Sequence, residues 1–345
     1  MLNDKTRYQT ALCFDDVLLA PQYSDIESRS EISCATDLCS RIALDLPIIS
    51  SPMDTITGYA MAASMTSAGG AGIIHRYNTI EVQAKAVRSA VVRGGSPVGA
   101  AIGVTGDYID RTCALYDAGA KIVCVDIAHG HHALMRHALK VLRNTFGTTI
   151  HIMAGNVATL EGFNDLADWG ADSIRVGIGG GSICSTRIQT GHGIPTLQSI
   201  IECSTTDRDA TIIADGGIRN SGDIVKALAA GANAVILGSL LAGTTQAPGD
   251  LVYVNGLPYK EYRGMASLEA QIDWRGHTSS IEGVSSMVPS KGNVSEVLGQ
   301  LRNGICSGFS YSGARSLSEF HAKANFIKQT SAGTVESSTH INRNL

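Results

Sequence analysis

The sequence lacks the features of a membrane-spanning or secreted protein. No apolar run reaches the about 18 residues that a helix needs to cross a bilayer, and the polar N-terminus does not resemble a signal peptide. The eight cysteines include no Cys-x-x-Cys pair, and none has the histidine spacing of a zinc site. We therefore expect a cytoplasmic protein without a membrane partner, in which most cysteines are small buried apolar residues.

A large excess of charge of one sign is also absent. The 27 basic and 31 acidic residues give a formal net charge of −4, and the pI is about 6.2. Proteins that bind nucleic acid are usually strongly basic, so nucleic acid is not the expected partner. The 345 residues, 44% of them hydrophobic, can bury a large core. This length suits either two average domains or one α/β barrel, which commonly has about 250 residues plus insertions.

Short β-branched runs alternate with segments of helical spacing from residue 47 onward. The predicted strands are Pro47–Ser51, Ala71–His75, Pro97–Gly103, Lys121–Ile127, Thr149–Ala154, Asp172–Ile178, Ala210–Ala214 and Ala232–Leu237. Predicted helices include Ile80–Arg93, Tyr108–Ala118, His132–Asn144, Leu160–Trp169, Leu197–Cys203, Ser221–Ala230 and Val294–Arg302. Such alternation indicates βαβ units and a parallel sheet.

The count of elements favours an α/β fold of the (β/α)8 TIM barrel type. A doubly wound sheet is the alternative, but its glycine-rich loop would follow the first strand, whereas here it follows the sixth. We expect one catalytic barrel domain over residues 1–345 with three additions. These are an irregular N-terminal extension (1–40), a weakly periodic flap region after strand eight (244–293) and a polar tail (331–345) that could be disordered.

The segment from Ile174 to Thr190 combines two chemical features. Four of the five residues 177–181 are glycine, and Cys184 follows three positions later. Glycines at a strand end allow the backbone amides to surround an anion such as phosphate, and a thiol beside them lies in a field that favours the reactive thiolate. The alternative is a glycine-rich connection with a buried cysteine; the adjoining Ser185-Thr-Arg187 favours the functional interpretation.

Polar residues and glycines follow seven of the eight predicted strands at their C-terminal ends. In a barrel these ends meet at the face that carries the active site, with phosphate sites near strands seven and eight. Any single one of these residues could be an ordinary solvent-facing loop residue, but together they predict an active site. The segments are Ser50–Asp54, His75–Asn78, Asp126–His131, Gly155-Asn156, the Cys184 loop, Asp215–Gly217 and Gly238-Ser239.

Several of these motifs together resemble the IMP dehydrogenase/GMP reductase family over residues 10 to 340. They are Ser51-Pro-Met-Asp-Thr55, Asp126-Ile-Ala-His-Gly130, Gly177–Thr186, Ala214-Asp-Gly-Gly-Ile218, Leu237-Gly-Ser239 and Tyr262-Arg-Gly-Met265. The resemblance implies a barrel, usually assembled as a homotetramer. It also implies a purine nucleoside monophosphate substrate (GMP or IMP), a nicotinamide cofactor, and a covalent bond between Cys184 and purine C2.

The resemblance also implies roles for individual residues. Those expected to bind the nucleotide are Ser51, Met53, Ser182, Asp215, Gly216, Gly217, Gly238, Ser239, Tyr262, Gly264 and Met265. Those expected to face the cofactor are Asp126, Asn156 and Arg175. A potassium ion would be held by the carbonyls of Gly179, Gly181 and Cys184, and by Glu336, Ser337 and Ser338 of a neighbouring subunit.

The flap region favours the reductase of the two family reactions. The dehydrogenase activates water with an adjacent Arg-Tyr pair, but here Arg275 is followed by Gly276, and no CBS pair interrupts the early strands. Thr186 and Glu282 match the residues with which the reductase protonates departing ammonia. The expected reaction is therefore NADPH-dependent conversion of GMP to IMP and ammonia.

Two alternatives stay open. Tyr262–Met265, Ser307–Ala314 and Ala332–Ser337 read more like the dehydrogenase, which would use NAD and need not carry CBS domains. A non-catalytic nucleotide-binding regulator is less favoured, since a regulator has no need of the thiol.

Overall fold

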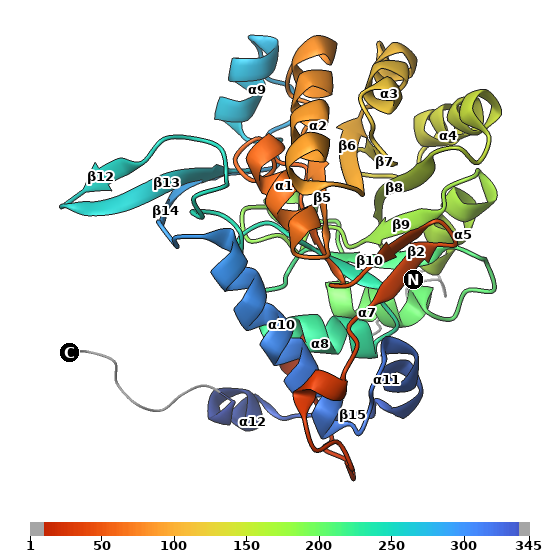
Figure 1. Cartoon of the computed structure of the whole chain (residues 1–345), viewed down its shortest axis with the longest axis vertical. Coiled ribbons are helices and arrows are strands. Elements are labelled where there is room, and N and C mark those ends of the chain that lie inside the picture. Colours follow the sequence, from red (N-terminus) through yellow and green to blue (C-terminus); the bar gives the residue numbers. More distant parts are fainter. Residues whose placement is uncertain (1–9, 338–345) are drawn as a thin grey trace, which may run out of the picture.

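The computed structural model describes residues 10–337 and contains a closed barrel of eight parallel strands (Figure 1). The strands follow one another around the barrel in chain order, and the last, β11, pairs with the first, β4. They are β4 (Ile48–Ser50), β5 (Ala71–Ile74), β6 (Val98–Ile102), β7 (Ile122–Asp126), β8 (His151–Val157), β9 (Ser173–Val176), β10 (Thr211–Asp215) and β11 (Ala234–Leu237). The predicted (β/α)8 barrel is confirmed, although β9 ends two residues before Ile178.

A helix follows each strand and covers the outside of the barrel (Figure 1). Polar caps start several of them: Thr79 accepts a hydrogen bond from the Val82 N–H, and Asn220 accepts one from the Asp223 N–H. None of the helices within residues 10–337 is long and apolar enough to cross a membrane. The outer helices are α1 (Tyr59–Ser67), α2 (Ile80–Gly94), α3 (Tyr108–Asp117), α4 (Ala133–Phe146), α5 (Leu160–Asp168), α7 (Thr196–Cys203), α8 (Ser221–Ala229) and α10 (Val294–Tyr311).

A hairpin from the N-terminal segment closes one end of the barrel. Strands β2 (Thr36–Cys39) and β3 (Ile42–Leu44) bring Leu38, Ile42 and Leu44 against the inward side chains of the barrel strands. Burying each such side chain stabilises the fold by about 1.5–3 kcal/mol. The N-terminal end of the strands is therefore plugged, and the C-terminal end stays open.

A small sheet joins the first and last parts of the described chain. Strand β1 (Val17–Leu19), between the turns η1 (Phe14–Asp16) and η2 (Arg29–Glu31), pairs antiparallel with β15 (Phe326–Lys328), which follows α11 (Leu317–Lys323). The expectation of disorder in the tail is wrong for Ser331–Glu336, which form helix α12. Thr330 caps this helix, and the Thr334 hydroxyl donates to the Asp15 carbonyl, so side-chain hydrogen bonds order a polar segment.

The flap region is more regular than its sequence indicates. Strands β12 (Val252–Val254), β13 (Leu257–Arg263) and β14 (Ser285–Pro289) form an antiparallel arm that projects from the barrel, and α9 (Leu268–Arg275) lies between β13 and β14 in the chain (Figure 1). Much of the arm is exposed on both faces, which removes the alternation of apolar and polar residues that marks a strand. The dipeptide Asn255-Gly256, which is typical of a two-residue hairpin turn, could have indicated the strands on either side of it.

Candidate active site

A cavity of about 410 Å³ opens at the C-terminal end of the barrel strands. All predicted site residues of the barrel and flap line it, although they come from six strand ends and the flap region. They are Ser51, Met53, Asp126, Asn156, Arg175, Gly179, Gly181, Ser182, Cys184, Thr186, Asp215, Gly216, Gly217, Gly238, Ser239, Tyr262, Gly264, Met265 and Glu282.

Glycines let two loops of this cavity lie backbone against backbone. Gly177 ends β9 with a φ of +142°, and a Cβ there would collide with the Asp215 carbonyl oxygen. Gly216 lies close to Gly180 and Gly181 in the same way. Larger residues would push the loops apart, which explains why this segment is rich in glycine.

Three backbone amides at this end of the barrel have no acceptor in the described part of the chain. Within residues 10–337, no hydrogen bond uses the N–H of Gly216, Gly217 or Ser239. The Tyr262 hydroxyl, buried beside them, lies 3.4 Å from Ser182 Oγ, and burial raises the pKa of Tyr262. Free amides and neutral hydroxyls around one hollow can hold a phosphate group.

Cys184 begins a chain of hydrogen bonds that leads into the flap region. Its Sγ lies 3.2 Å from Thr186 Oγ1, and that hydroxyl donates to Glu282 Oε2 over 2.8 Å. The backbone holds this arrangement, since Cys184 forms a bridge with Gly283 and the Ser185 N–H donates to the Glu282 carbonyl. A thiol, a hydroxyl and a carboxylate in sequence can carry a proton to or from a group bound at the sulfur.

Arg175 forms ion pairs with two carboxylates in the cavity wall. The guanidinium donates to Asp126 Oδ1 over 2.6 Å and to Asp215 Oδ2 over 2.8 Å, while Asn156 Nδ2 also donates to Asp215 Oδ2. Burial alone would lower the pKa of Arg175, but the charge of Asp215 and, behind it, that of Asp126 keep it raised. Asp215 Oδ2 accepts hydrogen bonds from both Arg175 and Asn156. Its Oδ1 can therefore accept a hydrogen bond from a ligand.

This network adds a role that the sequence did not indicate. Arg175 and Asn156 were expected to face the cofactor; they line the cavity, but they also fix the orientation of Asp215. The signal lies in the strand order, since β9 pairs with β10 and places Arg175 next to the end of β10.

Sequence reasoning also missed the contacts that anchor the flap region over the cavity. Arg263 Nη2 lies 2.6 Å from Asp54 Oδ2, and Arg263 Nη1 lies 2.6 Å from Asp273 Oδ2 on α9. The Tyr77 hydroxyl donates to the Met265 carbonyl, and its ring stacks on Trp274 at 5.9 Å. Arg263 and Asp54 both lie within motifs named in the sequence analysis, so their opposite charges could have indicated an ion pair between them.

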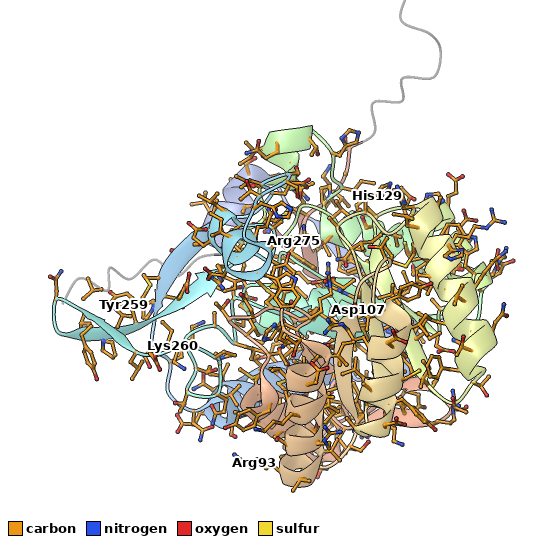
Figure 2. The ribbon with its side chains drawn as sticks, turned by 90° about the horizontal axis from the view of Figure 1, so that it is seen from above. Arg93, Asp107, His129, Tyr259, Lys260 and Arg275 are labelled. Atoms are coloured by element: carbon orange, nitrogen blue, oxygen red, sulfur yellow. The ribbon has the colours of Figure 1, made fainter. Side chains whose placement is uncertain are left out.

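Figure 2 separates the two parts of the flap region. Tyr259 and Lys260 lie on the projecting arm, whereas Arg275, at the end of α9, lies over the body of the barrel. The guanidinium of Arg275 is 5.9 Å from the centre of the Tyr77 ring. Helix α9 and the segment up to Glu282 are therefore the part of the flap region that covers the cavity.

The two described tail residues of the predicted potassium site lie outside the cavity. Glu336 and Ser337 belong to α12 and its end, where Ser337 Oγ donates to Gln329 Oε1 and to the Gly333 carbonyl. Neither lines the cavity, and Ser338 lies outside the described residues. In the described part of the chain, no three His, Cys, Asp or Glu side chains are grouped as ligands for a metal ion.

Comparison with known proteins agrees with this geometry. Residues 11–340 match the family model of the IMP dehydrogenase / GMP reductase domain. The inosine-5'-monophosphate dehydrogenase of Nitrosopumilus maritimus is 34% identical over 96% of this chain and 98% of its own, and the GMP reductase of Leishmania major is 31% identical over 95% and 96%.

A solved structure is similar as well. The crystal structure of a GMP reductase from Trypanosoma brucei in complex with guanosine 5'-monophosphate has a TM-score of 0.93 and 30% identity, covering 98% of this chain and 99% of that one. The relatives carry the names of two nicotinamide-dependent oxidoreductases. The chain therefore belongs to the IMP dehydrogenase/GMP reductase family of oxidoreductases.

Proposed function

We propose that this protein is a GMP reductase, which converts GMP, NADPH and a proton to IMP, NADP⁺ and ammonia. The observation that carries the proposal is the hydrogen-bonded chain from Cys184 through Thr186 to Glu282. It connects a nucleophile to a carboxylate that can supply the proton for a leaving amine.

The cavity can bind the nucleotide through its phosphate, ribose and base. The free amides of Gly216, Gly217 and Ser239, with Ser182 and Tyr262, would hold the phosphate. The free Oδ1 of Asp215 would accept from the ribose hydroxyls. Met53, Ser51, Gly238, Gly264 and Met265 line the same cavity and would contact the rest of the nucleotide.

The thiolate of Cys184 would then add to C2 of the guanine. Glu282 would protonate the 2-amino group through Thr186, and the C2–N bond would break to release ammonia while the sulfur stays bound. When bound, the nicotinamide supplies a hydride that reduces C2; the C–S bond then breaks and Cys184 recovers its thiolate. Asp126, on the cavity wall, would face the cofactor.

We also infer a potassium ion and a homotetramer, both on the resemblance to the family. The backbone oxygens of Gly179, Gly181 and Cys184 are neutral donors of the kind that potassium takes. The Gly181 carbonyl accepts from the Cys184 N–H and keeps a second lone pair for an ion. Within the one described chain α12 contacts η1, so Glu336 and Ser337 would have to reach such an ion in a neighbouring subunit.

IMP dehydrogenase is the second candidate, because the first relatives carry that name. In this chain the residue after Arg275 is Gly276, which ends α9 with a φ of +71°. A tyrosine would be strained at that φ, so the Arg-Tyr pair of the dehydrogenase has no equivalent here.

One pair of assays tests the proposal. The purified protein is incubated with GMP and NADPH, and separately with IMP and NAD, while the absorbance of reduced nicotinamide is followed. A falling signal in the first mixture supports the reductase, and a rising signal in the second establishes the dehydrogenase. Activity in neither mixture, with GMP still bound, identifies a non-catalytic regulator.

A further inference from the structure

A second cavity, of about 340 Å³, lies at the opposite end of the barrel from the active site. Its walls come from the turn of the β2–β3 hairpin and from the segments that lead into β6, β7 and β8. The volume is in the range of small-molecule sites. The lining residues are Arg41, Ile42, Ala43, Ser96, Pro97, Lys121, Thr149 and His151.

Two of these residues are cations without an acidic partner. Within residues 10–337, neither Arg41 nor Lys121 forms an ion pair or a side-chain hydrogen bond. Nearby, by contrast, Arg143 is paired with Asp172 at 2.7 Å. Both residues are exposed to solvent as well as lining the cavity, so an anion between them would be attracted by both charges.

His151 adds a buried polar atom that has no hydrogen-bond partner among the described residues. Met153 belongs to the cluster inside the barrel, and alternate residues of a strand face the same side, so His151 faces the interior as well. The side chain is 1% exposed, and its Nε2 lies 2.8 Å from Ser173 Oγ. Its Nδ1 is buried without a hydrogen bond, which usually costs about 1–3 kcal/mol.

We propose that this cavity is a binding site for a small phosphate dianion, either inorganic phosphate or a phosphate monoester. The guanidinium of Arg41 and the ammonium of Lys121 balance its charge, which is close to −2 for a phosphate monoester at neutral pH. The Nδ1–H of His151 donates to one of its oxygens while Nε2 accepts from the Ser173 hydroxyl. The hydroxyl of Ser96 is a further donor at the cavity wall, whereas that of Thr149 donates to the Phe146 carbonyl over 2.6 Å.

The state of His151 agrees with this arrangement. Burial lowers the pKa of His151 to about 4, so the ring is neutral at physiological pH. A neutral ring carries one N–H and one lone pair, and Ser173 and the anion use one of each. The site is independent of the proposed catalytic reaction, because its residues come from the other end of the strands.

Calorimetric titration with inorganic phosphate tests the proposal. The wild type is expected to bind phosphate at two sites per chain, the active-site amides and this cavity. In the double variant Arg41→Ala/Lys121→Ala, the affinity of this cavity for phosphate should fall by about tenfold or more, and only the active-site amides should still bind phosphate as in the wild type. The control Arg88→Ala/Lys140→Ala removes two exposed cations from α2 and α4 and keeps both sites.

Crystals soaked in tungstate, a heavy-atom analogue of phosphate, locate the ion. An anomalous peak among Arg41, Lys121 and His151 supports the proposal; a peak at the active site only, or equal phosphate binding by the two double variants, overturns it. Methyl phosphate and malonate separate the ligand classes, because malonate binding as tight as phosphate contradicts a phosphate site. Should the alanine variant fail to fold, Arg41→Gln/Lys121→Gln replaces it.

Discussion

The two ends of the barrel are built from the same eight strands but present different chemistry. At the C-terminal end, glycine loops leave backbone amides free beside Cys184 and Asp215. At the N-terminal end, the β2–β3 hairpin fills the opening, and the polar groups left there are side chains. The comparison shows that the two ends are filled differently: one end opens into the larger cavity, and at the other the hairpin packs into the barrel and leaves a smaller cavity beside its turn.

Removal of the proposed nucleophile at the open end is expected to have the largest effect. Cys184→Ala should lower kcat by about 10⁴-fold or more while GMP still binds, since the phosphate and ribose contacts do not involve the sulfur. Stopped-flow and equilibrium binding measure the two quantities. A variant that retains a tenth of its activity would show that the thiol is not the nucleophile.

Interruption of the proposed proton path is expected to have the next largest effect. Glu282→Gln and Thr186→Val should each lower kcat by about 10²–10⁴-fold with little change in KM for GMP, because the groups act on the leaving amine. The double variant should be no slower than the worse single variant if both serve one path. Glu296→Gln, at an exposed position on α10, is the matched control.

Truncation of a buried side chain at the N-terminal end of the barrel should reduce stability without changing the rate of the reaction. Leu38 is 1% exposed inside the barrel, so Leu38→Ala should lower the free energy of unfolding by about 2–5 kcal/mol. Urea denaturation measures this loss, and kcat per folded molecule should stay at the wild-type value. A fall in kcat would contradict the separation of the two ends. Leu257→Ala, on the exposed arm, should change stability by no more than about 0.5 kcal/mol.

The smallest expected effect is the pH dependence contributed by His151. Its pKa is about 4 in the folded chain and about 6.5 when unfolded, so its contribution to stability is complete above pH 6.5 and is lost as the pH falls toward 4. Between pH 7 and pH 5, His151→Asn should lose about 2 kcal/mol less stability than the wild type. His137→Asn, on the exposed face of α4, should follow the wild type. Equal pH slopes for His151→Asn and the wild type would mean that the ring titrates alike in both states.

The sequence predicts the open end well because its information is local. Each β-branched run is followed directly by its glycines and polar residues, and the Gly177–Thr186 segment contains both the cradle and the thiol. The family resemblance supplied Glu282, which lies 96 positions from Thr186 and could not be paired with it by spacing.

What the sequence did not predict depends on distant pairs. The ion pairs Arg175–Asp215 and Arg263–Asp54 can be predicted only when the strand order and the fold of the flap region are known. At the closed end, Arg41, Lys121 and His151 come from three separate segments, and each looks ordinary alone. Nothing in their spacing indicates that they share a cavity.

The pairing of β1 with β15 has a consequence for biosynthesis. Val17 lies opposite Lys328, so β1 leaves the ribosome long before the strand with which it pairs. At about 5–20 residues per second, this strand stays without its partner for about 15–60 seconds. We expect the nascent chain to expose the backbone edge of β1 until β15 has been synthesised.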